Sequence, residues 1–161
     1  MTEKLKNITK EDWRKLGFYY ERDDMNKKWI LVGSKNGLDD FCIILDRYVE
    51  NGENARIGEH EHIGPYGYLT IMTSKVFNVT SDYICGSLDD LKKLNMILKT
   101  EIKATQDQEL PTVKLIEDSF LHNNDYMIEL RLMEYGYDPA TADVQLWVFD
   151  GCHHCATKDV V

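Results

Sequence analysis

The sequence predicts a single α+β domain, in which a mainly antiparallel sheet of about five or six strands packs against two main helices. Two segments, residues 38–49 and 88–102, carry apolar residues at helical spacing. Other segments alternate apolar and polar residues, or are rich in aromatic and β-branched ones, as strands are. The length of 161 residues suits one domain. We expect residues 1–147 to form it and residues 148–161 to be a C-terminal tail.

The first half of the chain predicts a helix, a hairpin and a second helix. A short helix is expected from a cap at Thr9 to Gly17. Residues 18–22 and 28–32 are aromatic and β-branched with a polar loop between them, which indicates a hairpin. Residues 33–37 predict a turn from strand to helix. The second helix has one apolar face, made of Leu38, Phe41, Cys42, Leu45 and Val49.

The second half predicts further strands around the clearest helix of the chain. Residues 66–73 and 76–85 are expected to be two strands, paired through a turn at residues 74–75. Ser87 has the properties of a helix cap, with Asp90 in the capping-box position. Strands are expected within residues 112–116 and 125–135, and the second alternates strictly. At Asp138–Pro139 we expect either a helix cap or a tight turn.

Composition and charge exclude several classes of function. The formal net charge is −9, so binding to nucleic acid is disfavoured because the phosphates would be repelled. A membrane span needs about 20 consecutive apolar residues, and the longest apolar run is residues 41–45. No apolar leader is visible, so we expect a cytoplasmic protein with reduced thiols. Cys42 and Cys85 then read as small buried hydrophobic residues.

Two clusters contain potential metal ligands. His60 and His62 would lie on one side of an extended segment, with Glu61 on the other. They would need a third ligand, such as His122 or Cys155, and the alternative is a solvated polar loop. Cys152 and Cys155 enclose two histidines near the C-terminus. The alternative for that cluster is a frayed tail with incidental metal affinity.

Signatures of catalysis are missing from the sequence. The segment after Gly86 lacks the second glycine of a nucleophile elbow. Residues 33–37 lack the spacing of a phosphate-binding loop. We therefore predict neither catalytic residues nor a cofactor. Tyrosines in or near the expected strands, including Tyr66 and Tyr68, could serve a protein interface. Their alternative role is ordinary packing with hydroxyls at the rim.

Two segments resemble a known class of protein. Residues 59–69, EHEHIGPYGYL, and residues 135–143, YGYDPATAD, are similar to segments of immunity proteins from bacterial polymorphic-toxin and contact-dependent growth inhibition systems. In layout the resemblance extends over residues 17–145. It implies a cytosolic inhibitor that binds one cognate toxin domain, often a nuclease. It implies no catalytic residues, and the tail falls outside it.

The leading hypothesis is an acidic binding module that covers the basic active-site surface of a toxin domain. Nuclease clefts are positive because they hold phosphate, so an acidic partner gains association rate and charge complementarity. The candidate contacts are the acidic residues and tyrosines Asp23, Asp24, Asp39, Asp40, Glu59, Glu61, Tyr66 and Tyr68. A metal-binding protein or metal-dependent enzyme using His60 and His62 is the alternative. A homodimer formed through tyrosine-bearing strands is a third hypothesis.

Overall fold

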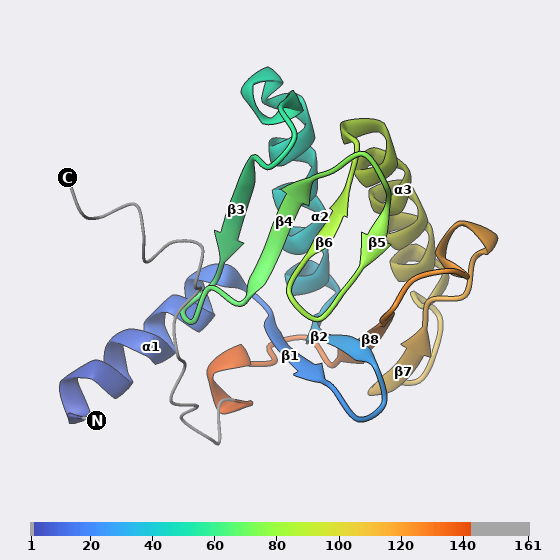
Figure 1. Ribbon diagram of the computed structural model, residues 1–161. Coiled ribbons are helices and arrows are strands. Elements are labelled where there is room, and N and C mark those ends of the chain that lie inside the picture. Colours follow the sequence, from blue (N-terminus) through green and yellow to red (C-terminus); the bar gives the residue numbers. More distant parts are fainter. Residues whose placement is uncertain (1, 143–161) are drawn as a thin grey trace.

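The computed structural model describes residues 2–142, which form three α-helices and two four-stranded sheets (Figure 1). The α+β class is therefore confirmed. The expected single sheet is instead two sheets. The elements are α1 (Glu3–Leu16), β1 (Tyr19–Asp23), β2 (Lys28–Ser34), α2 (Lys35–Glu50), η1 (Gly52–Ala55), β3 (His60–Ile63), β4 (Leu69–Thr73), β5 (Asn78–Val79), β6 (Ile84–Gly86), α3 (Leu88–Ala104), β7 (Thr112–Leu115), η2 (Ser119–Leu121), β8 (Met127–Met133) and η3 (Pro139–Thr141).

Both sheets are mostly antiparallel with one parallel pair at the centre. The first has the strand order β1-β2-β8-β7, with β2 and β8 parallel. The second has the order β3-β4-β6-β5, with β4 and β6 parallel. The hairpin of β1 and β2 is confirmed. The boundary expected between residues 147 and 148 lies outside the described residues.

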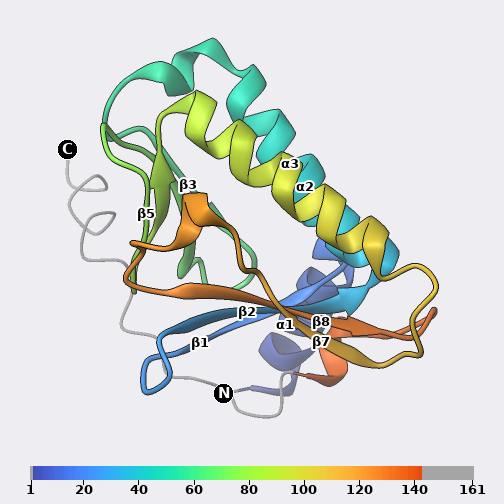
Figure 2. The ribbon, with the colours of Figure 1, turned by 90° about the vertical axis from the view of Figure 1, so that its right-hand side faces the viewer.

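Two helices cover one side of the first sheet. α2 and α3 lie side by side on this side, and α1 packs against η3 (Figure 2). The apolar faces predicted for α2 and α3 are confirmed, because Leu38, Phe41, Leu45, Leu91 and Leu98 are buried. Cys42 and Cys85 are buried free thiols, as expected. None of the described helices combines the length and the apolar character needed to cross a bilayer.

Helix ends follow the expected chemistry in two places and depart from it in one. Ser87 and Asp90 form a capping box at the start of α3, and Asp138 caps η3 with Pro139 after it. α1 begins earlier than expected, because Thr2 is its cap. Thr9 lies inside the helix, where its hydroxyl donates to the Leu5 carbonyl at 3.0 Å.

The pairing predicted for residues 66–85 is wrong. β4 does not form a hairpin with the following strand, and pairs instead with β3 and β6. The short β5 then pairs with β6 from the far edge. His60–Ile63 form strand β3, and not the solvated polar loop that was the alternative for this segment. Its stability comes from four residue pairs with β4, while the polar side chains of β3 give little strand signal of their own.

Candidate functional site

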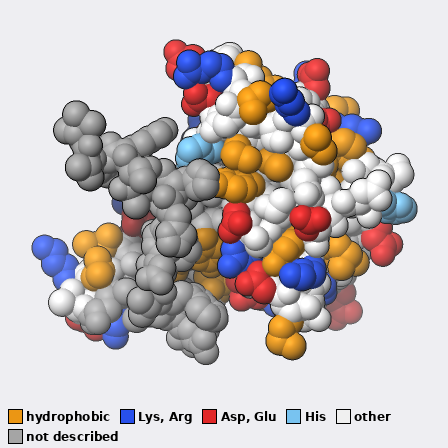
Figure 3. Space-filling model, viewed as in Figure 1, with side chains coloured by type: hydrophobic (Ala, Val, Ile, Leu, Met, Phe, Trp, Pro, Cys, Tyr) orange, Lys and Arg blue, Asp and Glu red, His pale blue; other side chains and the backbone are white. Residues whose placement is uncertain are grey.

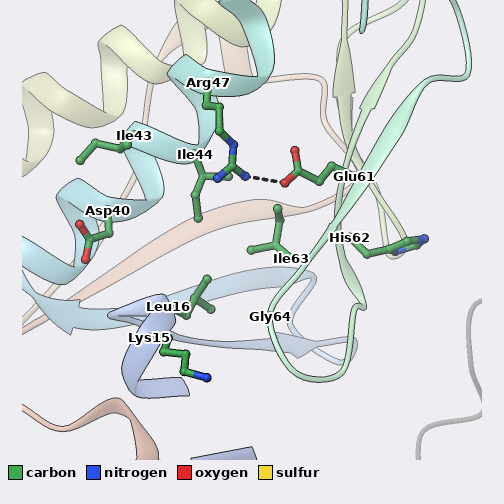
Figure 4. A pocket seen from close by; sticks show the side chains of 10 residues that line it. All are labelled: Lys15, Leu16, Asp40, Ile43, Ile44, Arg47, Glu61, His62, Ile63 and Gly64. Atoms are coloured by element: carbon green, nitrogen blue, oxygen red, sulfur yellow. Dashed lines mark hydrogen bonds and ion pairs between the residues drawn. The ribbon is translucent and has the colours of Figure 1, made fainter. Parts of the chain in front are cut away.

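An open groove of about 350 Å³ lies where the end of α1, the outer face of α2 and strand β3 meet (Figure 4). We call it the α2–β3 groove. Ten residues line it, and they come from three separate parts of the chain: Lys15, Leu16, Asp40, Ile43, Ile44, Arg47, Glu61, His62, Ile63 and Gly64. Three of them, Asp40, Glu61 and His62, are among the residues singled out in the sequence.

A close approach of two backbones shapes one end of the groove. α1 ends at Gly17, which has a left-handed φ of 88°. A β-carbon on Gly37, in the first turn of α2, would lie 2.0 Å from the Gly17 carbonyl oxygen. A position this close accepts only glycine, so Gly37 allows α1 to end directly against the start of α2. This contact fixes Lys15 and Leu16 beside the outer face of α2.

Asp40 is a half-buried carboxylate with no ion pair within residues 2–142. One of its oxygens occupies the space beside Gly17, 2.3 Å from where a β-carbon would be. Burial, and secondarily the neighbouring charge of Asp39, raises the pKa of Asp40. The C-terminal end of α1 also carries partial negative charge, so the Asp40 side chain is in an electrostatically unfavourable position.

An ion pair closes the other end of the groove. Arg47 on α2 binds Glu61 on β3, and both side chains point toward each other across the groove (Figure 4). Strand alternation places Glu61 on the side facing α2, while the imidazole of His62 points away from it (Figure 4). Because the ring of His60 contacts that of His62, the expectation that both histidines share the side opposite Glu61 is confirmed.

The walls between these charged ends are apolar. Ile63 is buried, Ile44 and Leu16 are half-buried, and Ile43 is 60% exposed. An exposed isoleucine next to half-buried aliphatic residues makes an apolar strip bordered by charges. Such a strip with a polar border is typical of protein-binding surfaces.

The two histidines of β3 contact each other, with ring centroids 5.1 Å apart. Nδ1 of His60 lies 3.0 Å from the Gly58 carbonyl, and Nδ1 of His62 lies 2.7 Å from the Gly67 carbonyl. Within residues 2–142, no group of three or more His, Cys, Asp or Glu residues is placed to hold a metal ion. His122, named as a possible third ligand, follows η2. Cys152 and Cys155 lie outside the described residues.

The other acidic candidates engage local partners. Asp39 binds Lys35 at 3.0 Å, and Glu59 binds Arg56 at 2.7 Å. Asp23 and Asp24 lie at the far end of β1 from the groove. Asp23 accepts from the backbone and side chain of Asn26, and Asp24 pairs with Arg22 at 2.8 Å and accepts from the Tyr126 hydroxyl. In Figure 3, acidic and basic side chains stand next to each other across the face shown. As partner contacts, these residues stay a prediction.

Tyr66 and Tyr68 belong to an aromatic cluster next to the groove. Their rings are stacked at 6.2 Å, and Tyr66 also meets Trp13 of α1 at 5.9 Å. The Tyr68 hydroxyl donates to the Tyr20 carbonyl at 3.2 Å, and burial raises the pKa of Tyr68. Both tyrosines are half-buried, so packing accounts for most of their contacts. Their role at an interface stays a prediction.

Sequence reasoning missed the apolar walls and Arg47. A signal for Ile43 existed, since it is an apolar residue off the buried stripe of α2 and therefore faces outward. Arg47 and Leu16 gave no such signal, because only the fold places them next to β3.

No family model, curated protein or solved structure matches the chain. A functional proposal therefore rests on the geometry of the groove and on the two segments that resemble immunity proteins.

Proposed function

We propose that the chain is a cytoplasmic immunity protein, which neutralises a toxin domain by covering a positively charged surface of that domain. The observation that carries the proposal is the α2–β3 groove, which joins an unpaired carboxylate to an apolar strip. A protein surface with these features suits a partner that presents both cationic and aliphatic groups.

The two segments with similarity to immunity proteins meet around α1, which supports the proposal. The first supplies Glu61, His62, Ile63 and Gly64 to the groove. The second contains Asp138, which accepts hydrogen bonds from Arg14 of α1 at 3.0 to 3.3 Å. These bonds from Arg14 hold the pKa of Asp138 below its ordinary value. One segment thus lines the groove, while the other fastens the helix whose end borders it.

The overall charge gives further support. A net charge of −9 creates a field that extends beyond the local ion pairs and attracts a basic partner. The metal-binding alternative has no comparable support, since no third ligand accompanies His60 and His62 within residues 2–142.

Co-expression tests the proposal. The product of the reading frame next to that of this chain in the source genome, where the proposal expects a toxin domain, is expressed in bacteria with and without the chain. We expect the toxin domain alone to stop growth, and the chain to restore it while forming a stable complex with the toxin in size-exclusion chromatography. Full toxicity in the presence of folded chain, together with no complex, would contradict the proposal.

A further inference from the structure

We propose that the α2–β3 groove receives one arginine side chain of the partner, with Asp40 as the group that binds its guanidinium. The inference rests on the proposed function in one respect: the arginine belongs to the protein that this chain neutralises. It goes further by naming the residue type that is bound and the carboxylate that binds it.

Asp40 is available because the two cations that line the groove with it, Lys15 and Arg47, already pair with other carboxylates. Lys15 pairs with Asp12 at 3.6 Å, and Arg47 pairs with Glu61. Figure 4 shows Lys15 pointing away from Asp40, and Arg47 pointing toward β3. Within residues 2–142 the Asp40 carboxylate therefore has no cation of its own, although Asp39 and the end of α1 both add negative potential around it.

The apolar walls select a long cation with an aliphatic stem. Ile43, Ile44 and Leu16 can pack against methylene groups, which long cationic side chains bury while keeping their charged head solvated. Arginine suits the site better than lysine, because guanidinium is more weakly hydrated and can bind a carboxylate through two parallel hydrogen bonds.

The first experiment uses peptides as probes and the full chain labelled with ¹⁵N. Acetyl-Gly-Arg-Gly-amide is titrated while amide resonances are recorded by NMR, and the same peptide with uncharged citrulline is the comparison. We expect the arginine peptide to shift the amides of Asp40, Ile43 and Ile44 in a saturable way, and the citrulline peptide to leave them in place. Absence of shifts with arginine, or equal shifts with both peptides, would overturn the inference.

Two matched variants locate the binding group. Asp40→Asn is expected to weaken binding of the arginine peptide by roughly tenfold or more, the usual effect of losing a hydrogen bond between charged groups. Asp107→Asn, an exposed acidic residue beyond the end of α3, should bind as the unchanged chain does. Because Asp40 makes no hydrogen bond or ion pair within residues 2–142, its variant should fold, which circular dichroism checks. Unchanged affinity in folded Asp40→Asn would refute the assignment.

The toxin assay separates this inference from the proposed function. If Asp40→Asn protects cells as well as the unchanged chain does, the inference fails and the proposed function stands. If the arginine peptide binds at Asp40 but the chain gives no protection, the proposed function fails and the groove remains an arginine site.

Discussion

Among single residues, Asp40 and Glu129 are opposite cases of a carboxylate removed from water. Asp40 is half-buried beside the charge of Asp39 and makes no ion pair within residues 2–142. Glu129 on β8 is 4% exposed, but Lys28 and Arg131 bind it at 2.7 and 2.9 Å. Burial acts to raise the pKa of Glu129, and the two cations outweigh it, so that the pKa lies below its ordinary value. The two residues should therefore respond oppositely to loss of charge.

Replacing Asp40 by asparagine should stabilise the protein slightly. The folded state raises the pKa of Asp40, so its charge costs stability at neutral pH, and that cost disappears below the ordinary pKa of an aspartate. We expect a gain in the free energy of unfolding of up to about 0.5 kcal/mol near neutral pH, the usual span for partly exposed positions. Urea unfolding of the variant and of the unchanged chain, at acidic and at neutral pH, measures this difference in the free energy of unfolding. A variant that is less stable than the unchanged chain at neutral pH would refute this account of Asp40.

Replacing Glu129 by glutamine should destabilise the protein by about 1–2 kcal/mol, because two cations lose a charged partner. The lowered pKa means that this stabilisation is present above the ordinary pKa of a glutamate, and is lost as the pH falls through the folded value. Urea unfolding near neutral pH checks the size, and the difference should shrink in acid. Glu134→Gln, at an exposed position just after β8, is the control and should change little. Equal stability of both variants would contradict the role given to Glu129.

How far single residues could be predicted depends on where their neighbours come from. Asp40 lies off the apolar stripe of α2, and that pattern alone does not reveal that Gly17, at the end of α1, lies against its side chain. In β8, Glu129 alternates with apolar residues, and this pattern gives no sign that Glu129 is buried. Its burial depends on Lys28, 101 residues earlier in the chain, which only the pairing of β2 with β8 brings close.

For the elements, the contact between α1 and α2 decides whether the groove exists. Gly37→Ala places a β-carbon 2.0 Å from the Gly17 carbonyl oxygen, so the two helices must separate. We expect a loss of about 1–3 kcal/mol in the free energy of unfolding, as for other overpacked positions. Gly52→Ala is the matched control, because nothing lies within 4 Å of its β-carbon. Thermal or urea unfolding of the pair tests this, and a Gly37→Ala variant as stable as the control would contradict it.

Elements with their own hydrophobic pattern could be predicted, and those that depend on pairing could not. α2 and α3 have continuous apolar faces, and β8 alternates, so their positions follow from the sequence alone. β3 is polar and β5 has two residues, so both exist because β4 and β6 offer them backbone partners. The groove was missed for the same reason, because one wall of it is β3.

For the whole molecule, local ion pairs and the overall charge act at different ranges. Most of the predicted acidic contacts are paired with a nearby cation, and such exposed pairs add little to stability. Their fields largely cancel at short range, while the net charge of −9 remains at longer range until salt screens it. A partner with a basic surface should therefore be attracted before any contact with the groove forms.

The central claim is that this protein works by covering a positively charged surface of a partner. Its most direct test is the association rate with the toxin domain that the proposal expects from the neighbouring reading frame, measured with purified proteins by stopped-flow fluorescence at increasing salt concentration. We predict that the rate falls by about tenfold or more between low and high salt, as electrostatically steered association does. A rate that does not change with salt would contradict the claim.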